Sequence, residues 1–106
     1  DTITYNAAIS ACGTGKKWVH ALQLFREMAD SRVKRDSITY NAVLQSIHEL
    51  EIGNLIFREG LLAHVFDECV VIDERQLDLH GCSSGAGILA LRWWWTEIVP
   101  VVQASA

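Results

Sequence analysis

The chain has 106 residues, of which 50% are hydrophobic and 21% are charged, and its formal net charge is −4. This length allows one domain at most, and the hydrophobic share excludes a disordered acidic tail. No apolar run reaches the roughly 20 residues of a membrane span, because Arg92, Glu97 and Pro100 interrupt the most apolar stretch. We therefore expect no membrane partner, and we expect any targeting segment to lie outside this chain.

The charges are unevenly distributed along the sequence. Residues 1–36 carry six basic and four acidic side chains, whereas residues 37–74 carry one basic and seven acidic side chains. A polyanion would therefore meet the first third of the chain and be repelled by the middle. The alternative interpretation is that these charges lie on solvated helix faces.

The cysteines do not form a metal-binding pattern. Cys12, Cys69 and Cys82 are an odd number without pair spacing, which is typical of a reducing compartment. His80 and Cys82 are near neighbours, but no second pair completes a tetrahedral zinc site. We expect neither a metal nor another cofactor.

An internal repeat organises the first two thirds of the chain. The segment DTITYNA at 1–7 recurs as DSITYNA at 36–42, and LFRE at 24–27 recurs as IFRE at 56–59. The first match has an offset of 35 residues and the second an offset of 32, so the second copy loses three residues between its two blocks. A period in the mid-thirties predicts a helical solenoid.

Each copy of the repeat is predicted to form two helices. In the first copy, Gly13-Thr14-Gly15 separates two stretches with apolar residues at helical spacing, and Thr4 is the expected cap of the first helix. In the second copy, the second helix is expected from about Ile52 to about Phe66. Because solenoids usually need about three or more repeats, we expect other repeats of the same longer chain to stack on these two.

Residues 2–36 resemble a pentatricopeptide repeat. The resemblance rests on Ile-Thr-Tyr-Asn at 3–6, Gly15 in the turn, the Ala-Leu and Leu-Phe pairs of the second helix, Glu-Met near its end, and Asp36. Arg35 departs from the family pattern, which usually has proline there. Residues 37–70 resemble a second, degenerate repeat that is shortened at its turn.

The resemblance implies recognition of single-stranded RNA, about one base per repeat. It implies that Asn6 and Asn41 read bases, that Asp36 is the partner of Asn6, and that Ile3 and Ile38 wedge the bases. The Asn6–Asp36 combination is similar to the uracil-preferring type of the family. For the second repeat, Glu68 is the expected partner of Asn41.

A structural interpretation of the same residues stays open. Both asparagines could satisfy amide groups at helix starts, and Asp1 and Asp36 could be caps. Similarly, Lys16, Lys17 and Arg26 could contact phosphates or form an exposed solubilising face.

A different pattern begins near residue 75. Alternating apolar and polar residues predict a strand at about 76–80, and a Gly/Ser-rich turn is followed by an expected helix at about 85–98 that ends at Pro100. For the tryptophans at 93–95, burial of at least two in the helix core is expected rather than base stacking.

Residues 75–106 resemble the start of a small MutS-related domain, of which the second half is missing. Relatives of that domain nick nucleic acid, and the resemblance makes Asp78 and His80 weak candidates for such catalysis. The alternative is a structural role at the strand end.

The predicted fold is therefore mainly α: an αα-hairpin solenoid of about two pentatricopeptide units (1–36 and 37–70), then a short strand and helix from an incomplete α/β domain. The leading functional hypothesis is RNA binding in organellar RNA processing, stability or translation, which implies the chloroplast or the mitochondrion. The alternatives are a helical-repeat scaffold with protein partners and, in a complete parent protein, an endonuclease.

Overall fold

The structure is a computed structural model that describes residues 1–67, 70–72, 77–79 and 83–105. Two helical hairpins come first: α1 (Thr2–Thr14) with α2 (Trp18–Asp30), and α3 (Ser37–Ile47) with α4 (Glu51–Leu62). They are followed by strands β1 (Val70–Ile72) and β2 (Leu77–Leu79). The C-terminal helical segment consists of α5 (Ser84–Trp93), the π-helical turn η1 (Trp94–Ile98) and α6 (Val99–Ser105). The mainly helical fold expected from the sequence is confirmed.

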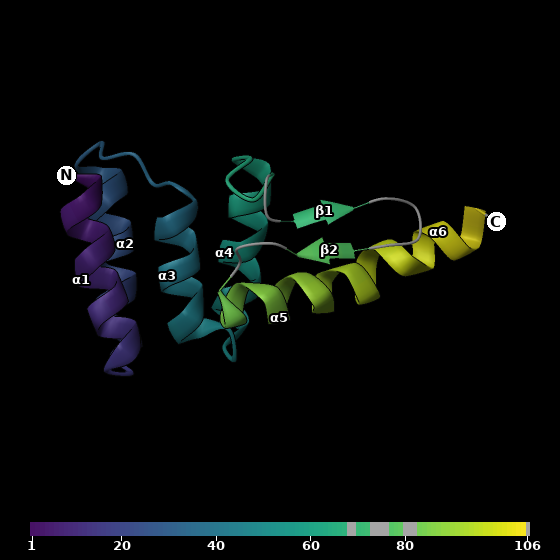
Figure 1. The fold of residues 1–106 in the computed structure, drawn as a ribbon, viewed down its shortest axis with the longest axis horizontal. Coiled ribbons are helices and arrows are strands. Elements are labelled where there is room, and N and C mark those ends of the chain that lie inside the picture. The colour runs from purple at the N-terminus through teal and green to yellow at the C-terminus, as the bar shows by residue number, and fades with distance from the viewer. Residues whose placement is uncertain (68–69, 73–76, 80–82, 106) are drawn as a thin grey trace.

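The helices form two arrangements. In Figure 1, α1 to α4 stand side by side, whereas α5, η1 and α6 run across their direction along the longest axis of the molecule. Among the described residues, no helix is both long enough and apolar enough to span a lipid bilayer.

One hydrophobic core joins the hairpins to the start of α5. It is built from the facing sides of α1 to α5, and the largest side chains that are almost completely buried include Ile9, Met28, Leu44, Phe57 and Leu89. Burying each such side chain stabilises the fold by about 1.5–3 kcal/mol.

The same tyrosine–glutamate hydrogen bond closes both hairpins. The Tyr5 hydroxyl donates to Glu27 Oε1 at 3.1 Å, and the Tyr40 hydroxyl donates to Glu59 Oε1 at 3.2 Å. The tyrosines are 35 residues apart and the glutamates 32. The second unit absorbs most of the difference in its first helix, since α3 has 11 residues and α1 has 13. The expectation that this repeat is shortened at its turn was therefore wrong.

Arg35 connects the first hairpin to the second. Its guanidinium bonds Glu59 Oε1 at 2.7 Å and lies 4.2 Å from the centroid of the Phe25 ring. Cation–π contact adds to the ion pair because the guanidinium stacks on an aromatic face. Burial and the nearby Glu59 carboxylate raise the pKa of the Tyr40 hydroxyl to about 12. The positive charge of Arg35 acts in the opposite direction. Arg35 thus has a structural role, because it holds the two hairpins together.

Two expected helix boundaries were wrong. Helix α1 starts at Thr2 and is capped by Asp1, whose carboxylate accepts from the Thr4 N–H at 2.8 Å, so Thr4 is not the cap. Helix α4 ends at Leu62, before the expected Phe66, because the chain turns through His64 at a φ of 61°. Phe66 then folds back into the core, where its ring stacks on Phe57 at a centroid distance of 5.2 Å.

The last helix does not end at Pro100. In η1 the Val99 N–H bonds the carbonyl of Trp94, five residues earlier, and α6 starts directly afterwards. Pro100 is the second residue of α6, directly after this π turn. Of the three tryptophans, Trp93 and Trp94 are half-buried and Trp95 is exposed, so none is fully buried.

The strand expected at 76–80 is present as β2, over three of those residues. It pairs antiparallel with β1, with Asp78 opposite Val71. This short hairpin does not confirm the resemblance to a small MutS-related domain. His80 lies outside the described residues, as do Cys69 and Cys82.

Candidate nucleic-acid interface

The first helices of the two units, α1 and α3, meet through Asn6. The Asn6 side chain is 7% exposed. Its Nδ2 donates to Asp36 Oδ1 at 3.1 Å, and its Oδ1 accepts from the Thr39 hydroxyl at 2.5 Å. Asp36 in turn caps α3 by accepting from the Thr39 N–H at 3.0 Å. Asn6 therefore braces the capped start of the next helix, and we call this set of Asn6, Asp36 and Thr39 the first junction.

Asp36 is kept ionised by its neighbours in the first junction. Partial burial alone would raise the pKa of its carboxyl, but hydrogen bonds from the Thr39 N–H and the Asn6 amide lower the pKa below its ordinary value. Hydrogen bonds to the charged form favour that form. The first junction thus holds a carboxylate, which can only accept hydrogen bonds.

The equivalent asparagine of the second unit, Asn41, meets α5. Asn41 Nδ2 donates to the Ser37 carbonyl at 2.8 Å, and Asn41 Oδ1 accepts from the Ser83 N–H at 2.7 Å. Ser83 caps α5: its hydroxyl oxygen lies 3.1 Å from the Ala86 N–H and 3.1 Å from the Asn41 carbonyl. We call Asn41 and Ser83 the second junction.

Helix α5 approaches α3 closely at this point. The Gly85 N–H donates to Gln45 Oε1 at 2.7 Å, and a Cβ at Gly85 would lie 2.6 Å from the carbonyl oxygen of Leu44. Only glycine fits so close to the backbone of another helix. Gly85 and the Gln45 side chain together fix the start of α5 on the side of α3.

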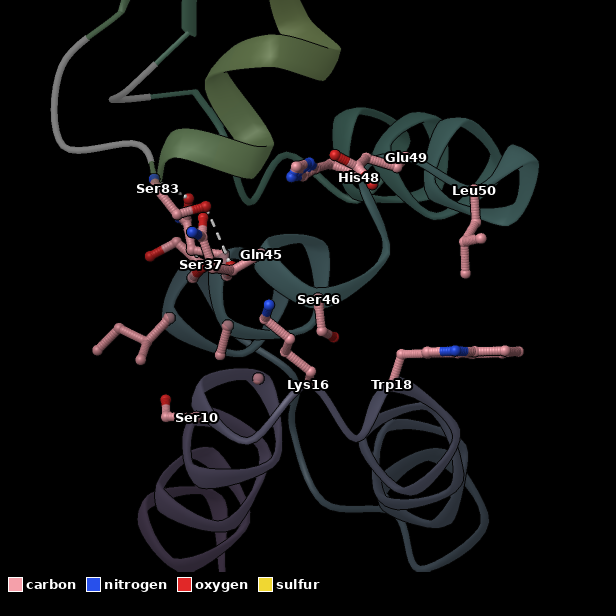
Figure 2. A pocket seen from close by; sticks show the side chains of 14 residues that line it. Ser10, Lys16, Trp18, Ser37, Gln45, Ser46, His48, Glu49, Leu50 and Ser83 are labelled. Atoms are coloured by element: carbon pink, nitrogen blue, oxygen red, sulfur yellow. Dashed lines mark hydrogen bonds between the residues drawn. The ribbon is translucent and has the colours of Figure 1, made fainter.

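An open groove of about 1030 Å³ runs over α3. Figure 2 shows Lys16 reaching from the α1–α2 turn toward α3, Trp18 and Leu50 at one end of the groove, and Ser83 at the other. The groove is lined mostly by uncharged polar and small residues, with a few charged or aromatic ones: Ser10, Gly13, Lys16, Trp18, Ser37, Ile38, Asn41, Ala42, Gln45, Ser46, His48, Glu49, Leu50 and Ser83.

The chemistry of the groove suits base edges better than phosphates. Four serines, an asparagine and a glutamine offer both donors and acceptors, whereas the fixed charges in the lining are one lysine and one glutamate. Bases are recognised through such mixed donor and acceptor groups, while phosphates attract clustered lysine and arginine.

The structure separates the predicted site residues into the groove, the first junction and one exposed position on α1. Ile38 and Asn41 line the groove, together with Lys16, and Ile38 is 61% exposed. Asn6 and Asp36 are brought together in the first junction but do not line the groove, and Ile3 is 81% exposed near the start of α1. The RNA-binding roles assigned to the two asparagines, the two isoleucines and Asp36 stay predictions. Catalysis by Asp78 and His80 also stays a prediction.

Sequence reasoning missed Ser83 and Gln45 as neighbours of Asn41. A serine directly before a Gly/Ala-rich helical run is a signal for a helix cap, so the cap at Ser83 could have been found. Its contact with α3, 42 residues earlier, had no signal in the sequence. The repeat period had instead pointed to Glu68, which lies outside the described residues.

The comparison with known proteins covers the region of α1 to α3. No curated protein and no solved structure matched the chain. Residues 1–48, which hold the first junction and most of the groove lining, match the model of the PPR repeat family, so this part of the chain is similar to a pentatricopeptide repeat.

Proposed function

We propose that the chain binds single-stranded RNA as part of a longer pentatricopeptide array. The match of residues 1–48 to the PPR repeat family supports this proposal. The proposal extends to a role in RNA processing, stability or translation in a chloroplast or mitochondrion, which follows from the family resemblance alone.

The observation that carries the proposal is the groove over α3. It combines an exposed isoleucine at the start of the helix with an asparagine one turn further on, Ile38 and Asn41. A base lying in this groove would stack on the Ile38 side chain and face the amide of Asn41. Lys16 is positioned to meet the backbone of the same strand.

The asparagines keep hydrogen-bonding capacity for a base. A primary amide has two N–H groups and two acceptor lone pairs. Asn41 uses one N–H for Ser37 and one lone pair for Ser83, so one donor and one acceptor remain. The same count holds for Asn6, but its side chain is 7% exposed and does not line the groove, so the proposal rests on Asn41.

Two units bind few nucleotides, and a net charge of −4 gives little general attraction to phosphate. The test therefore uses a method suited to weak binding: titration of the isotope-labelled 106-residue chain with single-stranded RNA octamers, followed by NMR. We expect the largest shifts at the side-chain amides of Asn41 and Gln45 and at the backbone of Ser83. A DNA duplex of the same length is the control ligand.

Shifts that are absent at millimolar RNA, or that lie on the outer helices α2 and α4 instead, would overturn the proposal. Asn41→Ala should weaken binding, whereas Gln23→Ala on the exposed side of α2 should not. An equal loss in both variants would show that binding is not localised to the groove.

A second candidate function is a scaffold for protein partners. It is favoured by the apolar residues that the C-terminal helical segment exposes, with exposed fractions of 55% at Leu91, 66% at Trp95 and 63% at Val101. Exposed apolar surface of this kind is common at protein interfaces. A protein complex that persists at high salt, without any RNA shifts in the groove, would favour this function over RNA binding.

A further inference from the structure

We infer that Trp18 is a stacking platform for a second base of the bound RNA, with purines preferred, and that Lys16 holds the phosphate between this base and the one at Asn41. The inference rests on the proposed RNA-binding function. It extends that function to the turn between α1 and α2, to which the repeat resemblance assigns no base.

Trp18 differs from the other apolar residues on its side of α2. The apolar residues three, four and seven positions later, on the same side of the helix, are Ala21, Leu22 and Phe25. They are buried, whereas Trp18 is 43% exposed and is not among the described side chains that form the core or pack against it. The second unit has Leu50 at the equivalent position, 32 residues later, and Leu50 packs against the core. The core therefore does not explain why an indole stands at position 18.

The Trp18 indole lies open at one end of the groove. Trp18 and Leu50 line this end, and Ser83 lines the other (Figure 2). Within the part of the chain that the structure describes, the indole makes no hydrogen bond, no ring contact and no cation–π contact. The Trp93 ring, by contrast, lies 6.0 Å from the Phe57 ring. An aromatic side chain with an open face in a groove is the kind of platform on which single-stranded nucleic acids stack their bases.

The chemistry of a stacking platform predicts which bases are preferred. Every base has a π-face, so stacking tolerates any sequence, and modest preferences follow the strength of stacking. A purine has two fused rings and covers more of an indole than a pyrimidine does. The groove end at Trp18 therefore favours adenine and guanine, and this preference does not depend on the base edge that faces Asn41.

Lys16 supplies positive charge beside this platform. Its backbone takes the left-handed conformation at a φ of 57°, and its side chain reaches toward α3 between Trp18 and Ser83 (Figure 2). It is the one lysine or arginine in the groove lining, and it makes no ion pair with any residue that the structure describes. Glu49, the acidic residue of the lining, lies apart from Lys16 in the same view. A phosphate held by Lys16 would link a base on Trp18 to the base at Asn41.

The first test replaces Trp18 by the residue of the second unit. Trp18→Leu keeps an apolar side chain and removes the aromatic plane, and Leu50 shows that this position of a unit accepts leucine. The probes are hexaadenylate and hexauridylate, titrated separately and followed by the NMR signals of the Asn41 side-chain amide. Trp95→Leu is the matched control, since Trp95 is 66% exposed but lies on the C-terminal helical segment and does not line the groove.

In the wild type, hexaadenylate should bind more tightly than hexauridylate and should shift the Trp18 ring protons upfield, because a stacked base shields them. Trp18→Leu should weaken the binding of hexaadenylate about fivefold or more, the value of one stacked base, and should remove most of the preference for adenylate. Trp18→Phe, which keeps an aromatic plane, should retain that preference. Trp95→Leu should bind both RNAs as the wild type does.

The second test addresses the phosphate. Adenosine monophosphate and adenosine differ only by that group, so their relative affinity, read from the Trp18 ring protons, reports the contact with Lys16. Lys16→Gln should remove the wild-type preference for the monophosphate. Lys17→Gln removes the same charge at an exposed residue outside the groove lining and should keep the preference. Hexaadenylate should bind at least about fivefold more tightly than the monophosphate, because the strand also reaches Asn41.

The outcomes separate this inference from the proposed function. If hexaadenylate shifts the Asn41 signals but not the Trp18 ring protons, or if Trp18→Leu binds it no more weakly than Trp95→Leu does, the inference is wrong and RNA binding stands. Loss of the monophosphate preference in both lysine variants would overturn the role of Lys16. If the monophosphate binds as tightly as hexaadenylate, the groove end takes free nucleotides, and the inference about a strand is wrong. If neither hexanucleotide shifts any groove signal in the wild type, the proposed function fails and the inference fails with it.

Discussion

The first and second junctions start from the same residue and lead to different structures. At the first, Asn6 meets a charged cap, and α3 continues side by side with α1. At the second, Asn41 meets an uncharged cap, and α5 runs across α3 with Gly85 against its backbone. The repeat asparagine therefore specifies contact with the next helix cap, but it does not specify the direction of the helix that follows.

The residues two positions after the two caps differ in size and in burial. They are Ile38 in α3 and Gly85 in α5. Ile38 is exposed, whereas Gly85 is buried in contact with Leu44 and Gln45. The absence of a side chain at position 85 allows α5 to approach the backbone of α3 closely.

The largest expected effect comes from filling that close contact. Gly85→Ala places a Cβ 2.6 Å from the Leu44 carbonyl oxygen, which is backbone and cannot move aside cheaply. We expect a loss of about 2 kcal/mol in the free energy of unfolding, measured by urea denaturation. Gly87→Ala is the control, because the nearest atom to its Cβ is Leu79 Cδ1 at 3.9 Å. It should stabilise by about 0.5–1 kcal/mol through helix propensity. Equal effects at both glycines would contradict the close approach.

A smaller effect is expected from removing the asparagines. Asn6→Ala deprives Asp36 and Thr39 of a partner in a buried place and should cost about 2 kcal/mol. Asn41→Ala should cost about 1 kcal/mol, because Asn41 is half-buried and water can replace the lost amide. The same denaturation experiment measures both. A greater loss at Asn41 would reverse the comparison and make the second junction the stronger one.

The smallest effect is a difference in acid sensitivity. The pKa of Asp36 is lower in the folded chain than its ordinary value of 3.8, so the unfolded chain takes up the proton first as the pH falls. The stabilisation by this carboxylate is complete above about pH 5 and is lost as the pH falls through 3.8 and then through the lower folded value. Asp36→Asn, which keeps a capping oxygen, should show a shallower loss of stability between pH 5 and pH 3, by less than about 1 kcal/mol. Thermal unfolding followed by circular dichroism at several pH values measures it, and identical profiles would contradict the lowered pKa.

The sequence predicted the two hairpins well because their information is local. The spacing of apolar residues and the glycines of the first turn predicted the helices of the first unit. The recurring tyrosine and glutamate predicted those of the second unit, where Tyr40 bonds Glu59 as Tyr5 bonds Glu27. The end of α4 was missed since a left-handed residue that is not glycine, His64, has no sequence signal. The continuation of the last helix past Pro100 depends on a π turn, which propensity does not reveal.

The candidate site was predicted only in part for a similar reason. Ile38 and Asn41 belong to the repeat and were found by comparing its copies. Ser83 and Gln45 belong to a contact between α3 and a helix about 40 residues later, and no periodicity predicts such a contact. Asn6 and Asp36 were expected to read one base together, which stays a prediction, and the sequence did not reveal that both brace the start of α3.

The glycine at position 85 also ties the shape of the groove to the start of α5. Its position is buried, and a Cβ there would meet the backbone of Leu44 and Gln45, so a larger residue would push α5 away from α3. Because Ser83, two residues earlier, bonds Asn41 and lines the groove, such a displacement would also change that end of the groove. The groove therefore depends on a residue that does not line it.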